Sequence, residues 1–393
     1  MTTILLTAAE PSGDAMGTAL MRALREMEPD ITFIGAGGVQ MRGEGLRGDL
    51  PTEKLAVMGP VDALAAWPRA RSIVSGLNTL AAQEKPDAAV LIDSWSFSRM
   101  VADGLRKSGI TAPMIKLAAP QVWASRPKRA EAAAELFDRI LCLLPFEPQY
   151  FEEAGGSATF IGNPNFRSVA SQERSAEAFR TRYELGDEPV LICLPGSRGG
   201  EVKRLMPVFG TAVTEIVRRV PGVRPVIVAA DNVADAVATE AEAWSALPLI
   251  VPSAERFDAY AAADVALAAS GTVSTELAIC ETPMVIGYIL GPVTAFWARR
   301  VVTTPYISVI NVAEQAFVIP ERVQEECRPE QLAADVIRLF TDDEARRQQL
   351  SAFRRILPTI LGTEDPAELA AREVLSLVHG ENRGDLDSSA AGE

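Results

Sequence analysis

Histidine is almost absent from this 393-residue chain: its one histidine, His379, lies close to an acidic, small-residue C-terminal stretch. A Ser-His-Asp triad or a multi-histidine zinc site therefore lacks its main ingredient. The four cysteines are widely separated and form no C-x-x-C pair, which is typical of proteins from a reducing compartment. Proton transfer in this protein must therefore use carboxylates.

Long hydrophobic runs and an excess of positive charge are also missing. The longest uncharged apolar stretch, residues 282–298, is broken by Gly287, Gly291 and Pro292 and is shorter than the roughly 20 residues of a spanning helix. Lys and Arg number 38 against 52 Asp and Glu, which argues against a broad polyphosphate-binding surface. The first nine residues lack the basic start of a signal peptide. We therefore expect a cytoplasmic protein with no transmembrane helix and no nucleic-acid partner.

Apolar residues are plentiful, at 48% of the chain against 23% charged residues, so we expect a globular protein. Short runs rich in Val, Ile and Leu alternate with helical patterns, which is the rhythm of parallel sheets covered by helices. These runs are residues 4–8, 31–35, 88–92, 114–117 and 140–144, and then 190–194, 225–229, 247–251, 265–268 and 284–286. The sequence predicts an α/β protein with two Rossmann-like doubly wound domains.

The domain boundary is predicted from a change in composition. Turn residues at 162–165 and a polar helical stretch after Ser171 separate the two sets of strands, so we place the domains at residues 1–170 and 171–360. A helix over residues 361–380 is predicted to cross back to the first domain. The small and acidic tail, residues 381–393, is predicted to be disordered.

Two polar segments of the first half follow predicted strands. Glu-Pro-Ser-Gly-Asp at residues 10–14 joins the first strand to a helix, and Asp93 follows the strand at residues 88–92. Both lie at the carboxyl ends of parallel strands, where open α/β sheets bind ligands. With no histidine available, Asp93 is the leading candidate for a general base that takes a proton from an attacking hydroxyl. The alternative is that Asp93, like Ser12 or Asp14, caps a helix.

Two glycine turns of the second half also join strands to helices. Residues 194–200, Leu-Pro-Gly-Ser-Arg-Gly-Gly, combine a flexible turn with the Arg198 cation, which suits a phosphate. Residues 270–272, Ser-Gly-Thr, open the next such helix, and Glu276 about one turn later can accept hydrogen bonds from ribose hydroxyls. Each motif has an equally simple explanation as a helix cap. Together they favour a nucleotide diphosphate site.

A tryptophan and two arginines stand at the head of an apolar helix face. The segment begins Trp67-Pro68-Arg69-Ala70-Arg71, and its apolar face includes Ile73 and Val74. This combination suits a lipid surface. A second apolar and basic cluster occupies residues 296–300. The alternative, that both faces pack on a domain core, stays open at this point.

With these segments in place, the chain resembles the lipid A disaccharide synthases, inverting glycosyltransferases of family 19, over nearly its whole length. The motifs that carry the resemblance occur in order. They are Ala9-Glu10-Pro11-Ser12-Gly13-Asp14, Leu55-Ala56-Val57-Met58-Gly59, Ile92-Asp93, Val122-Trp123-Ala124 with Arg126, Leu144-Pro145-Phe146-Glu147, residues 194–198 with Glu201, residues 269–272 with Glu276, Thr282-Pro283-Met284-Val285, Ala298-Arg299-Arg300 and Asn311.

The resemblance implies a GT-B architecture, with two Rossmann-like domains facing across a cleft, and a reaction that needs neither a metal nor a cofactor. The implied donor is UDP-2,3-diacylglucosamine and the implied acceptor is 2,3-diacylglucosamine 1-phosphate. Their products would be a β-1,6-linked disaccharide 1-phosphate and UDP. The resemblance also implies a peripheral protein on the inner face of a Gram-negative inner membrane. It leaves the oligomeric state open, with a homodimer as one option.

Carried onto this chain, the resemblance makes Asp93 the base that activates the acceptor's 6-hydroxyl. The acceptor side would include Glu10, Ser12, Gly13, Asp14, Trp123 and Arg126. The UDP-sugar would be held by Ser197, Arg198, Glu201, Ser270, Gly271, Thr272, Glu276, Tyr288 and Asn311. The membrane side would include Val61, Leu64, Trp67, Arg69, Arg71, Ile73 and Val74.

The chain departs from the family pattern at several places, and two of them lie beside predicted site residues. Beside the predicted base, residues 94–98 read Ser-Trp-Ser-Phe-Ser in place of Ala-Pro-Asp-Phe-Asn, which removes a carboxylate. After Asn311, residues 314–317 read Glu-Gln-Ala-Phe in place of Ala-Gly-Arg-Glu, which removes an arginine. Two alternatives follow: a GT-B UDP-sugar enzyme with another lipid acceptor or an epimerase activity, and a relative that binds nucleotide or lipid without turnover.

Overall fold

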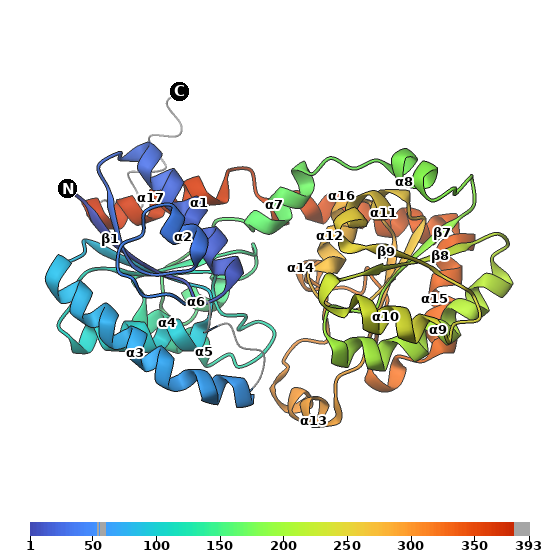
Figure 1. The fold of residues 1–393 in the computed structure, drawn as a ribbon, viewed down its shortest axis with the longest axis horizontal. Coiled ribbons are helices and arrows are strands. Elements are labelled where there is room, and N and C mark those ends of the chain that lie inside the picture. Colours follow the sequence, from blue (N-terminus) through green and yellow to red (C-terminus); the bar gives the residue numbers. More distant parts are fainter. Residues whose placement is uncertain (53–54, 56–59, 381–393) are drawn as a thin grey trace. The chain divides into compact units, whose positions relative to one another are not determined.

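The computed structural model describes residues 1–52, 55 and 60–380, and of residues 60–66 it describes the backbone alone. The chain divides into two compact units. Residues 1–164 together with the C-terminal residues from Gly362 form the first unit, and residues 165–361 form the second. Each unit is an α/β body built on its own sheet (Figure 1).

The sheet of the first unit has, in the described part of the chain, the strand order β2-β1-β3-β4-β5-β6, with neighbouring strands parallel. The strands are β1 (Thr3–Thr7), β2 (Thr32–Ala36), β3 (Ala88–Ile92), β4 (Met114–Leu117), β5 (Arg139–Cys142) and β6 (Ala158–Phe160). All five residues of β3 are buried, because helices cover both faces of the sheet.

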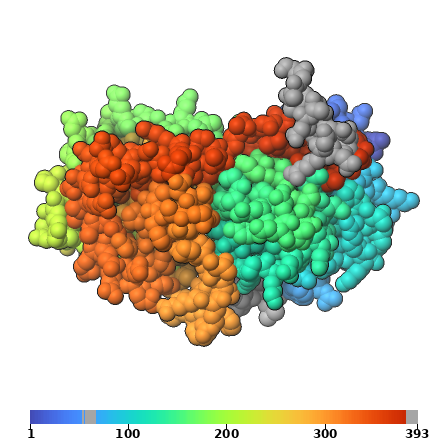
Figure 2. All heavy atoms as spheres, turned by 180° about the vertical axis from the view of Figure 1, so that it is seen from behind, coloured from blue at the N-terminus to red at the C-terminus, as the bar shows by residue number. Residues whose placement is uncertain are grey.

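The helices of the first unit form two layers around this sheet. They are α1 (Pro11–Met27), α2 (Val39–Gly43), α3 (Pro60–Glu84), α4 (Trp95–Lys107), α5 (Arg129–Leu136), α6 (Pro148–Glu152) and α17 (Pro366–His379). Side chains of α3, α4, α5 and α6 share one apolar core, and side chains of α1, α2 and α17 share the other. The C-terminal helix α17 packs beside α1 (Figures 1 and 2).

A buried ion pair fixes α17 to the sheet. Arg139 on β5 donates to the carboxylate of Glu373 on α17, and both side chains are buried. Because an unpaired charge at this depth would be strongly unfavourable, the pair specifies where α17 docks.

The second unit repeats the architecture, with the strand order β12-β11-β10-β7-β8-β9 among the described residues. The strands are β7 (Val190–Leu194), β8 (Arg224–Ala229), β9 (Leu249–Pro252), β10 (Val265–Ala268), β11 (Met284–Tyr288) and β12 (Glu321–Val323). Neighbouring strands are again parallel. The α/β prediction of two doubly wound sheets is confirmed.

The remaining helices belong to this unit, with α7 at its junction with the first unit in the sequence. They are α7 (Pro164–Ser171), α8 (Ala176–Arg182), α9 (Gly199–Arg219), α10 (Ala234–Ala241), α11 (Arg256–Ala262), α12 (Val273–Ile279), α13 (Pro292–Val301), α14 (Val309–Glu314), α15 (Pro329–Thr341) and α16 (Asp343–Leu361), with short 3-10 helices at Asp231–Val233, Ser253–Glu255 and Gln324–Glu326. Side chains of α9, α10 and α15 form one core with the sheet. None of the described helices has the length and apolar character needed to cross a membrane.

Candidate functional site

Asp93 follows the last residue of β3 and adopts a left-handed backbone conformation, with φ of 56°. This turn points its carboxylate at the end of β1. Oδ2 accepts a hydrogen bond from the Glu10 N–H at 2.8 Å, and both carboxylate oxygens lie 3.3 Å from the Ala9 nitrogen. The main chain between β1 and α1 therefore cradles the Asp93 carboxylate.

Gly13, in the first turn of α1, makes this cradle possible. A Cβ built on Gly13 would lie 1.8 Å from Oδ2 of Asp93, well inside van der Waals contact. Glycine is therefore required here because the carboxylate approaches the helix backbone so closely. Glu10 and Ser12 are exposed beside it, at the start of the helix.

The ionisation of Asp93 is set by opposing effects. Burial raises its pKa to about 6, while the N–H groups of Glu10 and Ala9 and the charge of Lys116 oppose this rise. A partly buried carboxyl whose pKa is raised to about 6 has the properties of a general base. The structure thus places the predicted base in a suitable environment.

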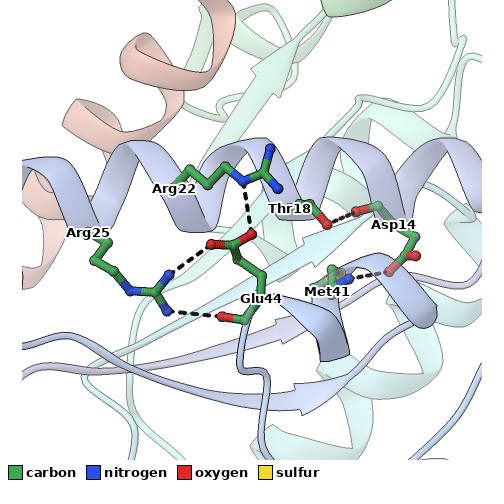
Figure 3. A network of polar contacts seen from close by, with 6 residues as sticks. All are labelled: Asp14, Thr18, Arg22, Arg25, Met41 and Glu44. Atoms are coloured by element: carbon green, nitrogen blue, oxygen red, sulfur yellow. Dashed lines mark hydrogen bonds and ion pairs between the residues drawn. The ribbon is translucent and has the colours of Figure 1, made fainter.

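Asp14 has a structural role in the first unit. Its carboxylate is buried and accepts hydrogen bonds from the N–H groups of Gly38 (2.8 Å), Gln40 (2.9 Å) and Met41 (3.2 Å) at the start of α2. Figure 3 shows the contact with Met41. In the structure its side chain caps the short helix α2, and its predicted place on the acceptor side stays a prediction. Hydrogen bonding fixes it there because three N–H donors converge on one carboxylate.

The far end of α2 is held by a second carboxylate. Glu44 accepts from Arg22 at 2.8 Å and from Arg25 at 3.0 Å, and its carbonyl accepts from Arg25 at 3.0 Å (Figure 3). Both arginines lie on α1. Ion pairs and caps therefore tie α2 to α1 along its length.

Trp123 and Arg126, predicted on the acceptor side, follow β4. Trp123 is buried, and its indole N–H donates to Glu147 at 3.1 Å. Burial raises the pKa of Glu147 to about 7, although bonds from Trp123 and from the N–H groups of residues 143 and 144 oppose the rise. Arg126 is exposed and has a positive φ of 56°. Trp123 therefore shapes the loop, and Arg126 is free to face a ligand.

In the second unit, the turn after β7 presents a cation. Gly196 has φ of 103°, a left-handed region that favours glycine, and Arg198 precedes α9. Arg198 is exposed and donates to buried Glu201 at 2.9 Å, and the Tyr288 hydroxyl donates to the same carboxylate oxygen at 3.2 Å. Ser197 is exposed beside Arg198.

The second predicted turn, residues 270–272, follows β10, the strand that neighbours β7. β10 pairs with β7, with Ala268 opposite Leu194, so residues 270–272 emerge at the same sheet edge as the Arg198 turn. Ser270 is half-buried, and Gly271 and Thr272 are exposed ahead of α12. Burial raises the pKa of Glu276, and Arg256, 3.9 Å away, opposes the rise. The structure brings these predicted residues together at one edge.

Asn311 closes a loop of the second unit. Its side chain is fully buried, donates to the Ile319 carbonyl and to Glu321 at 2.8 Å each, and accepts from the Ile319 N–H at 2.9 Å. Both N–H donors of the Asn311 amide are therefore used in closing the loop between α14 and β12, and its contact with the UDP-sugar stays a prediction.

The predicted lipid-facing residues separate into two groups. Trp67, Arg69 and Arg71 are exposed on α3, but Ile73 is buried in the apolar core and Val74 packs against that core. The burial of Ile73 argues against its contact with lipid, because this part of the apolar stripe of α3 covers the sheet. Val74 also lines a surface hollow with Trp67 and Arg71, and its contact with lipid stays a prediction. The predicted side chains Val61 and Leu64 lie outside those that the structure describes.

Comparison with known proteins decides the family. A family model described as lipid-A-disaccharide synthetase matches residues 4–369. The chain belongs to this family. It is 39% identical over 384 residues to a lipid-A-disaccharide synthase of Paramagnetospirillum magneticum, covering 95% of this chain and 97% of that one. It is 36% identical over 378 residues to one from Pseudomonas putida, covering 95% and 98%.

Solved structures share the fold at much lower identity. A UDP-GlcNAc 2-epimerase of Neisseria meningitidis matches with a TM-score of 0.57 and 13% identity, covering 97% of this chain and 99% of that chain. The glycosyltransferase of kitacinnamycin matches with a TM-score of 0.57 and 16% identity, covering 96% and 99%. The chain is a glycosyltransferase with the GT-B fold, as predicted. Among the described residues, no group of three or more His, Cys, Asp and Glu side chains is arranged to hold a metal ion.

Proposed function

We propose that this chain transfers 2,3-diacylglucosamine, with inversion, from its UDP donor to the 6-hydroxyl of 2,3-diacylglucosamine 1-phosphate. The observation that carries the proposal is the Asp93 carboxylate, held against the start of α1 by two N–H groups and by the close approach of Gly13. Family membership supplies the reaction, and this carboxylate supplies the chemistry that the reaction needs.

In this mechanism Asp93 takes the proton of the acceptor hydroxyl as its oxygen attacks the anomeric carbon of the donor. The bond from that carbon to the diphosphate oxygen breaks, and UDP leaves with the bonding electrons. The pKa of Asp93, raised by burial to about 6, leaves the carboxylate ionised at neutral pH and still basic enough to accept the proton.

The donor would be held in the second unit. Arg198 and the N–H groups at the start of the 21-residue helix α9 can stabilise the negative charge of the departing diphosphate. Ser197, Ser270 and Thr272 add hydroxyl donors at the same sheet edge. Glu276 can accept from the ribose hydroxyls. Such charge stabilisation would replace the metal that other transferases use.

The lipid substrates require access to a membrane surface, and we place it at residues 67–71 of α3. Trp67 is 51% exposed and stands beside the exposed Arg69 and Arg71. An exposed indole with two cations suits the interface of an anionic bilayer. We propose that this surface rests on the inner face of the inner membrane.

The helix α13 offers a second surface of similar chemistry. Phe296 and Trp297 are more than half exposed, and none of the residues of α13 is buried. Arg300 lies over the Phe296 ring. Figure 2 shows this segment, in orange, at the lower edge of the second unit. Its exposure supports a contact with lipid.

Vesicle binding tests the lipid surface. A Trp67→Glu, Arg71→Glu double variant should lose co-sedimentation with anionic vesicles, and Phe296→Glu, Trp297→Glu should report separately on α13. Both pairs are exposed, so the fold should survive. Lys85→Glu, an exposed position at the end of α3, serves as the charge control. Unchanged recovery of the Trp67 variant would remove residues 67–71 of α3 from the membrane contact.

The reaction itself is tested by UDP release from purified protein with both lipid substrates in detergent and a chelator present, with the product identified by mass. We expect a disaccharide phosphate and UDP in equal amounts. An Asp93→Asn variant should lose turnover by at least about 100-fold while it still binds UDP. UDP binding without any disaccharide would point to another acceptor, and release of free sugar epimer would point to the epimerase alternative.

A further inference from the structure

Lys116 is a buried cation that no part of the proposed mechanism uses. It lies on β4 with its side chain completely buried, an environment that lysine rarely occupies without partners. Its Nζ donates to three main-chain carbonyls, those of Leu91 (3.2 Å), Asp93 (2.5 Å) and Leu117 (2.9 Å). An ammonium has three N–H donors, so these carbonyls satisfy its charged form completely.

These carbonyls lie where β3 and β4 end and the chain turns. Asp93 and Ala118, the first residues after the two strands, both adopt left-handed conformations, with φ of 56° and 63°. Residues with a Cβ adopt this region only at a cost in energy. The Leu117 carbonyl also accepts from the Asp93 N–H at 3.1 Å. The ammonium therefore joins both turns at the point where the chain presents Asp93.

The charges of Lys116 and Asp93 affect each other's pKa. Burial lowers the pKa of Lys116 to about 7, and the carboxylates of Asp93, beyond β3, and Glu10, beyond β1, oppose this decrease. In return the Lys116 ammonium opposes the rise that burial imposes on the pKa of Asp93, whereas the Glu10 carboxylate adds to that rise. Each ionised partner thus favours the ionised form of the other.

We propose that Lys116 is the positioning residue of this site: its ammonium fixes the turn that carries Asp93 and keeps the Asp93 carboxylate ionised, without touching a substrate. The inference rests on the proposed role of Asp93 as the base. Lys116 would act through its hydrogen bonds to the main chain and through its effect on the charge of Asp93.

Kinetics of Lys116→Met and Lys116→Arg test the proposal. In Lys116→Met we expect kcat to fall about 100-fold, because the turn is no longer fixed, with both KM values within about twofold of wild type. The acid limb of its pH profile should move up by about one unit, because Asp93 loses a neighbouring cation. Lys116→Arg should keep the acid limb in place. Lys107→Met, an exposed lysine at the end of α4, is the matched control.

A folded Lys116→Met variant with wild-type kcat and an unmoved acid limb would overturn the proposal. If that variant does not fold, the proposal is tested by titrating Lys116 itself, which leaves this residue unchanged. The chain has six lysines, so the ¹³Cε resonance of Lys116 can be followed in lysine-labelled protein. Asp93→Asn should lower the pKa of Lys116, because the ammonium loses its first counter-charge.

A Lys116 titration that is the same in wild type and Asp93→Asn would also overturn the proposal. This experiment measures the coupling without any turnover. If the wild-type protein makes no disaccharide, the proposed function fails while the titration still judges the coupling between Lys116 and Asp93.

Discussion

Adding one carbon atom at Gly13 should separate catalysis from folding in this protein. A Cβ at this position would lie 1.8 Å from Oδ2 and 2.6 Å from Cγ of Asp93, whereas Cβ atoms essentially never approach closer than 3.0 Å. The carboxylate of a Gly13→Ala variant must therefore retreat by about 1.2 Å, the difference between 3.0 and 1.8 Å. This retreat pulls it away from the N–H groups of Ala9 and Glu10.

The expected loss follows from the displacement. A misplacement of about 1 Å typically costs about 100-fold in rate, and loss of a general base costs about 100-fold to 10,000-fold. We therefore expect kcat of Gly13→Ala to fall at least about 100-fold. Alanine is a better helix former than glycine by about 1 kcal/mol, which offsets part of the strain, so the variant should remain folded.

The assay is steady-state UDP release at saturating substrates, with UDP affinity and thermal unfolding measured on the same preparations. UDP affinity should be unchanged, because the proposed donor residues lie in the second unit. Gly43→Ala is the matched control: it lies on α2, and an added Cβ there meets nothing within 4 Å. Wild-type kcat in Gly13→Ala would refute the reasoning, because the carboxylate could then leave its cradle without consequence for the reaction.

Three further predictions concern the pH profile, the donor site and α17. Because the pKa of Asp93 is raised to about 6 and the base acts ionised, kcat/KM should rise about tenfold per unit below pH 6 and level off above it; a limb near pH 4 would contradict this assignment. Arg198→Ala should weaken UDP binding by about tenfold or more in calorimetry, with secondary structure unchanged. Glu373→Leu leaves Arg139 buried without its partner and should cost about 3–5 kcal/mol in denaturant unfolding, whereas replacing both residues by apolar ones should cost far less.

The strands were predictable because both sheet faces are covered. A strand buried on two sides must be apolar along its whole length, as β3 and β7 are, and such runs stand out in the sequence. Asp93 and Arg198 could be found for the same reason, since each is a charged residue placed just after such a run. The edge strands β6 and β12 were missed, because three-residue strands with partly exposed side chains carry no such pattern.

The roles of individual polar residues were harder to predict than the sheets. Asp14 and Asn311 are polar residues near predicted turns, and nothing in the local sequence distinguishes a side chain that faces a ligand from one that closes a loop. The N–H donors on Asp14 come from α2, 24 to 27 residues along the chain, and Asn311 is satisfied by residues eight and ten positions away. Lys116 stood inside an apolar run, and its partners at the end of β3 lie 23 to 25 residues away.

Both units use one arrangement to hold a charged group at the carboxyl edge of a sheet. In the first unit the partly buried Asp93 carboxylate interacts with the charge of the buried Lys116 ammonium, which also donates to the Asp93 carbonyl. In the second unit the exposed Arg198 is hydrogen-bonded to the buried Glu201, which also accepts from Tyr288. A charge at a ligand-binding edge is free to move in solvent unless a second group fixes it, and a buried partner of opposite sign fixes it without occupying the space of the ligand. In the first unit the buried Lys116 ammonium therefore favours the ionised form of Asp93, and its effect should be found in kcat and in the pH profile. In the second unit the buried Glu201 carboxylate orients the Arg198 guanidinium. We expect the direct contacts to the substrate to be made by Asp93 and Arg198.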